Sequence, residues 1–247
     1  MNSIEKTWRN FLKECINNGE WVTKDDGDEI LEITDNHAFI TNVADEVVMQ
    51  GQAFNLDIFL KLIGVGAFNI TGYPITDLAL QGYVKQLDES TQINNLTDEG
   101  SSNFVYTYPE RLFNVKQSTR KGEVVYENQV EVIVNRLREH SGSNRAVANL
   151  YMCALDKDEQ HIPCLQFVGA FIRDNKLSLH ILFRSNDLYG AFPSNMLFLQ
   201  YLGLKITEDL KEDYPLLTFN GLYYNSVSLH IYKGDYEQAQ KVIGENK

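Results

Sequence analysis

A cysteine and an arginine stand at chemically useful positions in the second half of the chain. Cys164 follows a proline and opens an apolar segment, and Arg184 stands near the end of the next such segment. A cysteine thiolate is a nucleophile, and a nearby guanidinium lowers the pKa of the thiol. The forked donors of a guanidinium also match phosphate oxygens. Together with the polar side chains described next, and if the strand ends lie side by side, this pair could bind a phosphorylated, hydrogen-bonding ring beside a nucleophile.

Further hydrogen-bonding side chains accompany this pair. Ser228, His230 and Tyr232 alternate with apolar residues, so they share one face of a predicted strand. Asn195 begins an apolar helical run, and Asp187 ends the motif Arg-Ser-Asn-Asp. If the strand ends lie side by side, these groups surround the thiol. A single cysteine or histidine is commonly an ordinary core residue, so the order of the whole set carries the interpretation.

The composition is that of an acidic protein of ordinary hydrophobicity. There are 22 lysines and arginines against 34 aspartates and glutamates, which gives a formal net charge of -12. Nucleic-acid affinity depends on basic side chains, so we expect no nucleic-acid partner, although a few focused arginines can bind a small phosphorylated ligand. No run is apolar for long enough to span a membrane, and the charged N-terminus is unlike a signal peptide. We therefore expect a cytoplasmic protein with no membrane partner.

The cysteines are too few and too scattered for a disulfide framework or a zinc site. They stand at Cys15, Cys153 and Cys164. This usage is typical of a reducing compartment, and it leads us to expect no metal.

The periodicity of apolar residues predicts mixed helices and strands. We expect helices at residues 4–18, 54–63, 127–139, 194–204 and 236–247, and strands at residues 30–33, 146–154, 166–173, 177–184 and 228–232. The polar segment 86–103 predicts an exposed excursion. Because no regular alternation of strand and helix appears and no linker interrupts the chain, we expect one α+β domain over residues 1–247.

The order Pro-Cys, Arg-Ser-x-Asp, Pro-x-Asn and His-x-Tyr resembles thymidylate synthase and its pyrimidine-hydroxymethylase relatives. The resemblance is strongest over residues 105–235. It implies a large mixed β-sheet flanked by helices, and a homodimer whose two active sites are shared. It also implies that Cys164 adds to C6 of a pyrimidine nucleoside monophosphate, with 5,10-methylenetetrahydrofolate or a related pterin as the one-carbon donor.

The resemblance assigns the binding roles position by position. They fall on Arg184, Ser185, Arg145 and Lys24 for the phosphate, on Asn195 for the pyrimidine edge, on His230 and Tyr232 for the sugar hydroxyl, and on Asp187 for the pterin. Arg145 would reach into the site of the partner subunit.

The resemblance assigns two further roles, and the sequence departs from the family pattern at four positions. Tyr108 resembles the tyrosine that assists removal of the C5 proton, although Pro109 replaces the usual glycine after it. Asp57 stands where the family has the glutamate that manages protons, so it is either that group or a first-turn residue that answers a helix dipole. Asn144 replaces one arginine of a phosphate-binding pair, and Leu165 replaces the histidine after the nucleophile.

The expected reaction is methylation of dUMP to dTMP. A neutral amide at Asn195 can donate to O4 and accept from N3–H, which favours uracil. The short polar end at residues 236–247 lacks the apolar segment that closes the site in thymidylate synthases. Water could therefore trap the exocyclic methylene intermediate as a hydroxymethyl group, or a different reductant could supply hydride. Two alternatives therefore stay open. One is a hydroxymethylase of dUMP, UMP or a cytidylate, and the other is a catalytically degraded nucleotide-binding homologue.

Overall fold

The computed structural model describes residues 3–41, 106, 108–118 and 121–244. The expected helix at 54–63, the expected excursion at 86–103 and Asp57 lie outside the described residues. The domain boundary 1–247 stays a prediction.

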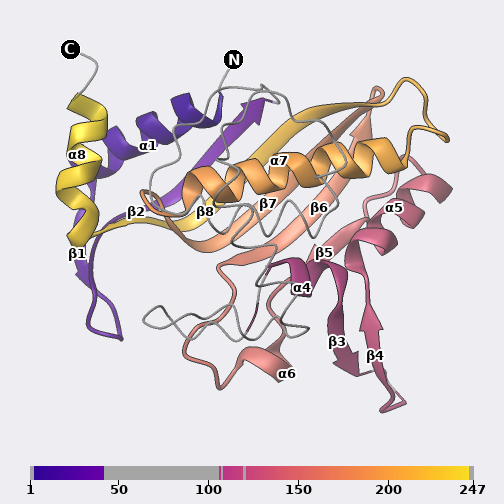
Figure 1. Ribbon diagram of the computed structural model, residues 1–247, viewed down its shortest axis with the longest axis horizontal. Helices are drawn as coiled ribbons and strands as arrows, with labels where there is room; N and C mark the ends of the chain where they lie inside the picture. The colour runs from indigo at the N-terminus through magenta and orange to yellow at the C-terminus, as the bar shows by residue number, and fades with distance from the viewer. Residues whose placement is uncertain (1–2, 42–105, 107, 119–120, 245–247) are drawn as a thin grey trace, which may run out of the picture.

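A six-stranded mixed sheet forms the centre of the described structure (Figure 1). Its order is β1 (Glu20–Thr23), β2 (Glu29–Thr41), β8 (Thr218–Tyr232), β7 (Lys176–Asp187), β6 (Leu165–Arg173) and β5 (Val147–Asn149). Neighbouring strands are antiparallel, except that β7 and β8 run parallel. A separate hairpin joins β3 (Val115–Ser118) and β4 (Val124–Glu127). The expected α+β class with a large mixed sheet is confirmed.

The helices pack around this sheet (Figure 1). They are α1 (Ile4–Asn18), α4 (Tyr108–Phe113), α5 (Gln129–Glu139), α6 (Cys153–Asp156), α7 (Phe192–Asp209) and α8 (Tyr236–Gly244), with a 3₁₀ turn η3 (Lys233–Asp235) before α8. The long α7 crosses β7 and β8, and α1 contacts β2, α7 and α8. None of the helices in the described ranges is both long and apolar enough to cross a membrane.

Helix α1 follows the predicted spacing of apolar residues. Trp8 and Leu12 are fully buried on its inner face, and the Ser3 side chain caps its first turn by accepting from the Lys6 amide. The Trp8 indole donates to the carbonyl oxygen of Leu188 at 2.7 Å. This bond connects the helix to the residue that directly follows Asp187, the last residue of β7.

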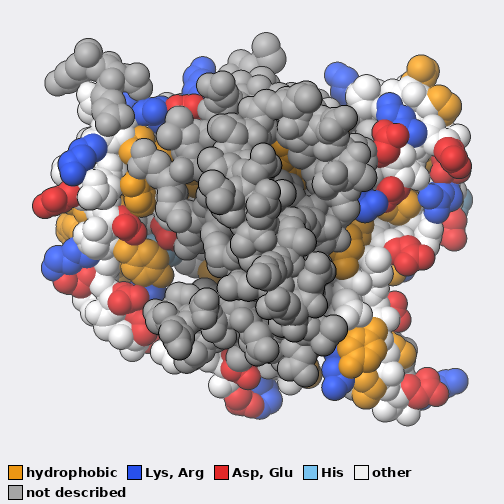
Figure 2. Space-filling model, viewed as in Figure 1, with side chains coloured by type: hydrophobic (Ala, Val, Ile, Leu, Met, Phe, Trp, Pro, Cys, Tyr) orange, Lys and Arg blue, Asp and Glu red, His pale blue; other side chains and the backbone are white. Residues whose placement is uncertain are grey.

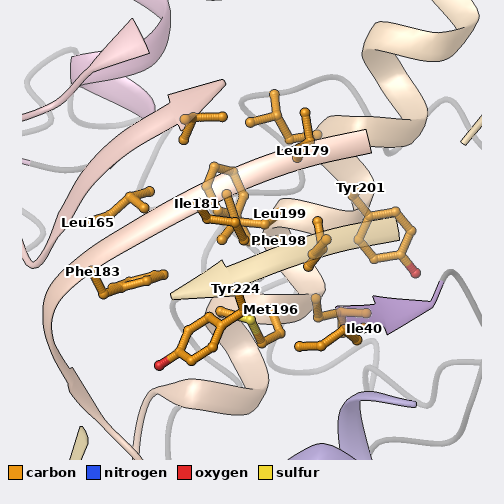
Figure 3. Packing of buried hydrophobic residues seen from close by; sticks show 14 of the residues in the cluster. Ile40, Leu165, Leu179, Ile181, Phe183, Met196, Phe198, Leu199, Tyr201 and Tyr224 are labelled. Atoms are coloured by element: carbon orange, nitrogen blue, oxygen red, sulfur yellow. The ribbon is translucent and has the colours of Figure 1, made fainter. Parts of the chain in front are cut away.

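Helix α7 begins with Phe192 and Pro193, because proline fits the first turn of a helix, where its missing amide costs nothing. Figure 3 shows Phe198 and Met196 packed against Ile181 and Tyr224 of the sheet. Each large apolar side chain buried in this way contributes roughly 1.5–3 kcal/mol. The helix thereby fixes the position of Asn195 in its first turns.

The expected strand at 146–154 is shorter in the structure. Strand β5 ends at Asn149, and the chain then forms the short helix α6. The Asp156 carboxylate accepts from the Met152 amide at 2.6 Å and lies 2.5 Å from Arg111, so this segment turns instead of extending. The apolar residues alone did not reveal that turn.

The visible surface mixes charges of both signs. Figure 2 shows acidic and basic side chains interspersed on the described surface, and hydrophobic side chains gathered over the β3–β4 hairpin. That hairpin carries the exposed Val124 and Tyr126.

Candidate active site

The pairing of the strands brings several of the predicted site residues side by side across the sheet, in two neighbouring rows that run from strand to strand. His230 on β8 pairs with Glu32 on β2 and with Asp187 on β7, and Ser228 pairs with Ser185. Paired residues on neighbouring strands direct their side chains to the same face, as do residues two apart along a strand. These groups therefore share one face at one end of the sheet.

Arg184 holds the segment that carries the candidate nucleophile. Its backbone amide donates to the carbonyl oxygen of Cys164 at 2.8 Å. Its guanidinium donates to the carbonyl oxygens of Pro163 at 3.1 Å and Ile162 at 2.8 Å. Both the backbone and the side chain of Arg184 therefore fix the approach to Cys164.

The Cys164 thiol lies among opposing electrostatic influences. Burial raises its pKa above the ordinary value, while the positive charge of Arg184, and more weakly that of Lys24, opposes this rise. The carboxylate of Asp187 adds to the rise. The two cations therefore offset part of the effect of burial, and the net pKa of the thiol still lies above its ordinary value.

Tyr108 lies directly beside the nucleophile segment. Its hydroxyl oxygen accepts from the backbone amide of Leu165 at 3.3 Å. Burial raises the pKa of Tyr108 well above its ordinary value, so the side chain is a neutral phenol. The neighbouring Tyr106 donates to the carbonyl oxygen of Ile162 at 3.2 Å. The two tyrosines therefore flank the chain on both sides of Cys164.

His230 is a neutral, buried imidazole. Its side chain is 3% exposed, and burial, with Lys24 and Arg184 adding to the effect, lowers its pKa to about 4. The Nδ1 atom lies 3.4 Å from the Ser185 hydroxyl and 3.5 Å from the Ser228 hydroxyl. The buried Nε2 atom has no hydrogen-bond partner within the part of the chain that the structure describes.

Lys24 reaches this cluster from the turn between β1 and β2. Its ammonium group lies 3.4 Å from the Tyr232 hydroxyl and 5.0 Å from the centre of the Tyr232 ring. It also forms ion pairs with Asp26 at 2.6 Å and Asp28 at 3.3 Å. Two carboxylates therefore share its charge.

Asn195 is held by a chain of hydrogen bonds through Asn186, a residue to which no sequence motif assigned a role. Its side-chain nitrogen is assigned as the donor to the Asn186 oxygen at 3.1 Å, and Asn186 donates to the Tyr224 hydroxyl at 3.1 Å. All three side chains are buried. Asn186 fills the variable position of Arg-Ser-x-Asp, so its place in the motif is the signal that could have identified it.

Asp187 ends β7 in a tight turn. Its Oδ1 atom accepts from the amides of Gly190 at 2.9 Å and Tyr189 at 3.1 Å. A Cβ atom at position 190 would lie 2.5 Å from Asp187 Oδ2, so any larger residue there would displace the carboxylate from this position. Burial raises the Asp187 pKa to about 6, against the effect of these hydrogen bonds and with a contribution from Asp235. The second oxygen of this carboxyl group can accept a hydrogen bond from an N–H donor.

Arg145 stands apart from this cluster. It is exposed and lines an open hollow of about 540 Å³, together with His140 and Tyr214. None of the other predicted site residues within the described ranges lines that hollow. This position is compatible with a contribution to a second subunit, which stays a prediction.

A buried ion pair connects two segments next to the site, and no sequence motif predicted it. Arg111 on α4 lies 2.5 Å from Asp156 on α6, with both side chains almost inaccessible to solvent. The Arg111 guanidinium also lies 5.7 Å from the centre of the Tyr106 ring. This pair joins the helix that carries Tyr108 to the segment that leads to Cys164.

Comparisons with known proteins identify the family of this chain. The sequence model of the family described as thymidylate synthase matches residues 7–247. A Methanosarcina mazei protein named "Putative thymidylate synthase" is 27% identical over 241 residues, which cover 98% of this chain and 92% of that protein. Proteins with the same name from Methanococcoides burtonii and Methanocaldococcus jannaschii are 26% and 32% identical. The first match covers 98% of this chain and 92% of that protein, and the second covers 70% and 72%. With the family match spanning almost the whole sequence, the chain belongs to the thymidylate synthase family.

Proposed function

We propose that this protein transfers a one-carbon unit to C5 of a pyrimidine nucleotide, and that its reaction is the methylation of dUMP to dTMP. Family membership supports the C5 transfer. The observation that carries the proposal is the fixed pairing of Cys164 with Arg184, whose backbone and guanidinium hold the nucleophile segment. His230 and Ser185 lie in the adjacent rows of the sheet.

The chemistry follows from the thiol. The Cys164 sulfur adds to C6 of the uracil ring, and the electron pair of the C5–C6 double bond moves toward C5 and O4. C5 then becomes nucleophilic enough to accept a one-carbon unit. Loss of the C5 proton and departure of the thiolate restore the double bond. Tyr108, a neutral phenol beside Cys164, is the group that we expect to help remove that proton.

Arg184 and Ser185 would bind the phosphate, and Lys24 would add charge from its turn. A guanidinium binds phosphate through two parallel hydrogen bonds, whereas an ammonium acts as a point charge. Because Lys24 is already paired with Asp26 and Asp28, we expect its contribution to be the smaller one. The nucleotide phosphate would then compete for the same guanidinium that favours the Cys164 thiolate.

Asn195 would select the base. Its amide is fixed by Asn186 and can still accept from N3–H and donate to O4 of uracil. Cytosine presents an acceptor at N3 and a donor at its exocyclic amine, so the two bases need opposite amide orientations.

Asp187 would hold the pterin ring of 5,10-methylenetetrahydrofolate or a related cofactor. When bound, this cofactor would supply the one-carbon unit at the oxidation level of formaldehyde, and a hydride from the reduced pterin or from another reductant would complete the methyl group. The partly buried carboxyl group, already anchored on one oxygen by Gly190 and Tyr189, offers its other oxygen to ring N–H donors.

A homodimer would complete the site. A row of ring contacts crosses four strands and consists of Phe39, Tyr223, His180 and Phe171, of which only His180 and Tyr223 are stacked, and Tyr223 is 40% exposed. Exposed apolar surface on a sheet is a typical dimer contact. Arg145, exposed and outside the cluster, would bind the phosphate in the second subunit.

The proposal is tested by incubation with dUMP labelled with tritium at C5 and with 5,10-methylenetetrahydrofolate. We expect tritium release and a product heavier than dUMP by one methyl substitution, and we expect both to be abolished in Cys164→Ala. A hydroxymethyl product would replace the methylation claim with the second reaction of the family. Tight binding of dUMP without tritium release would contradict catalysis altogether.

A further inference from the structure

Glu32 on β2 lies beside the His230 side chain, and no motif in the sequence pointed to it. The two residues are register partners across β2 and β8. The Ser228 hydroxyl forms a short hydrogen bond to Glu32 Oε1 and lies 3.5 Å from His230 Nδ1. Glu32, Ser228 and His230 therefore form a continuous chain of polar groups.

The chemistry of these groups sets the direction of each hydrogen bond. An ionised carboxylate accepts hydrogen bonds and cannot donate, so the Ser228 proton points toward Glu32. The Ser228 oxygen can then only accept from the imidazole. A neutral imidazole carries one proton, and this arrangement places it on Nδ1. The Ser185 hydroxyl, 3.4 Å from the same Nδ1, can also accept and so keeps its own proton for another partner.

The other ring nitrogen consequently carries a lone pair and no proton. His230 Nε2 is buried and unpaired within the described residues. A buried polar atom without a partner costs about 1–3 kcal/mol, so such an atom points to a ligand that completes it. A lone pair in this position accepts from a hydroxyl group. It would repel a group that can only accept.

We propose that Glu32 is a positioning residue that acts through Ser228 to hold His230 with its proton on Nδ1, so that Nε2 selects a substrate whose sugar donates a hydroxyl hydrogen bond. The choice of ligand rests on the proposed function, because a nucleotide supplies the hydroxyl. The tautomer does not depend on that function. Glu32 touches no substrate in this scheme, since its effect passes entirely through Ser228 and His230.

The tautomer is measured by nitrogen-15 NMR of the imidazole in the full chain, without any ligand. We expect wild-type His230 to show an unprotonated Nε2, which resonates far downfield of a protonated ring nitrogen. In Glu32→Ala the Ser228 proton is free to turn toward Nδ1, and in Ser228→Ala the link is lost, so both variants should gain the Nε2–H form. Glu20→Gln, which removes one negative charge at the register partner of Glu32 on β1, is the matched control and should leave the tautomer unchanged.

Two results of this measurement would overturn the proposal. One is a proton on Nε2 in the wild-type protein. The other is an Nδ1–H tautomer that persists in both Glu32→Ala and Ser228→Ala. Ser228→Thr keeps the hydroxyl group and should keep the wild-type spectrum, which separates the loss of the link from a general loosening of the strand.

The ligand part is tested by the affinity ratio of dUMP to 2′,3′-dideoxyuridine 5′-monophosphate. We expect wild type, Glu20→Gln and Ser228→Thr to prefer dUMP by about tenfold or more, since the dideoxy compound leaves Nε2 unpaired. The preference should fall toward equality in Glu32→Ala, while the affinity for the dideoxy compound changes little. An unchanged preference in Glu32→Ala would overturn this role. If neither nucleotide binds any of these proteins, the proposed function fails, whereas the NMR result still decides the tautomer.

Discussion

The backbone amide of Arg184 donates to the carbonyl oxygen of Cys164 at 2.8 Å, so the two residues are neighbours across β7 and the start of β6. The guanidinium of Arg184 holds the two carbonyl groups that precede the cysteine. A single arginine therefore fixes the nucleophile in space and also supplies the positive charge beside its sulfur.

Removal of the Arg184 charge should make Cys164 a weaker nucleophile. Burial already raises the thiol pKa and Arg184 opposes that rise, so Arg184→Ala should raise the pKa further. We expect the pH profile of alkylation by iodoacetamide to move to higher pH, with a rate at fixed neutral pH lower by roughly tenfold. Arg184→Lys, which keeps the charge, should show a smaller shift. Arg173→Ala removes an arginine from the far end of β6 and should leave the profile in place, whereas an identical profile for Arg184→Ala would exclude the electrostatic role.

Tyr108→Phe should separate two steps of the reaction. Without the hydroxyl group, removal of the C5 proton should slow by about 10²–10⁴-fold, the usual effect of losing a positioned proton-transfer group. Addition of Cys164 to the ring should continue, so covalent protein–nucleotide adduct should still form while tritium release falls. Tyr126→Phe alters an exposed tyrosine of the hairpin and serves as the control. Equal loss of adduct and of tritium release in Tyr108→Phe would show that the residue only supports the fold.

Asp187 should give the protein a characteristic pH dependence of stability. Its pKa is raised from 3.8 to about 6 in the folded protein, so the folded state binds a proton more tightly than the unfolded state. The resulting stability is fully present below pH 3.8 and is lost as the pH rises through about 6. Because Asp187→Asn removes this titration, the unfolding free energy of wild type minus that of the variant should fall by on the order of 1–3 kcal/mol over this window.

The wild-type protein must be compared with Asp187→Asn, because the titration of His230 changes stability with pH in the opposite direction to that of Asp187. Its pKa is lowered from 6.5 to about 4, so its contribution is present above pH 6.5 and is lost as the pH falls through about 4. The two effects oppose each other in the wild-type curve. Urea unfolding at a series of pH values provides the measurement, and parallel curves for wild type and Asp187→Asn would refute the perturbed carboxyl group.

The buried pair of Arg111 and Asp156 should matter for stability far more than surface pairs do. Arg111→Met leaves the Asp156 carboxylate buried without its partner, which we expect to cost about 3–5 kcal/mol in urea unfolding. Asp213→Asn breaks the exposed pair with Arg138 and should cost less than about 1 kcal/mol. A loss in Arg111→Met no larger than that of the surface control would mean that the pair is not buried as described.

Local patterns were sufficient for several elements of the fold. The spacing of apolar residues in 4–18 predicted α1, and its end at Asn18 agrees with the structure. Between the strands expected at 166–173 and 177–184, Asp174 and Asn175 form a turn with positive φ angles of 50° and 57°, which aspartate and asparagine tolerate. The alternation of Ser228, His230 and Tyr232 correctly predicted a strand, because a period of two is a property of the backbone itself.

Contacts between distant segments could not be predicted in this way. Glu32 and Ser228 are 196 positions apart and meet only because β2 pairs with β8 in one particular register. Arg111 and Asp156 are 45 positions apart, and each alone resembles an ordinary surface charge. The family resemblance indicated which residues form the site. It did not indicate the polar residues that contact the site residues, since those contacts depend on the strand register and packing of this chain.

The central claim is that the Cys164 sulfur adds to C6 of a uracil nucleotide, and trapping with 5-fluoro-dUMP in the presence of 5,10-methylenetetrahydrofolate tests it most directly. Fluorine at C5 cannot leave as a proton does, so a covalent complex should accumulate at the addition stage. Mass spectrometry of the digested protein should find the nucleotide on the peptide that contains Cys164, and Cys164→Ala should form no complex. An adduct on any other residue, or saturating nucleotide binding with no adduct in the wild-type protein, would contradict the account.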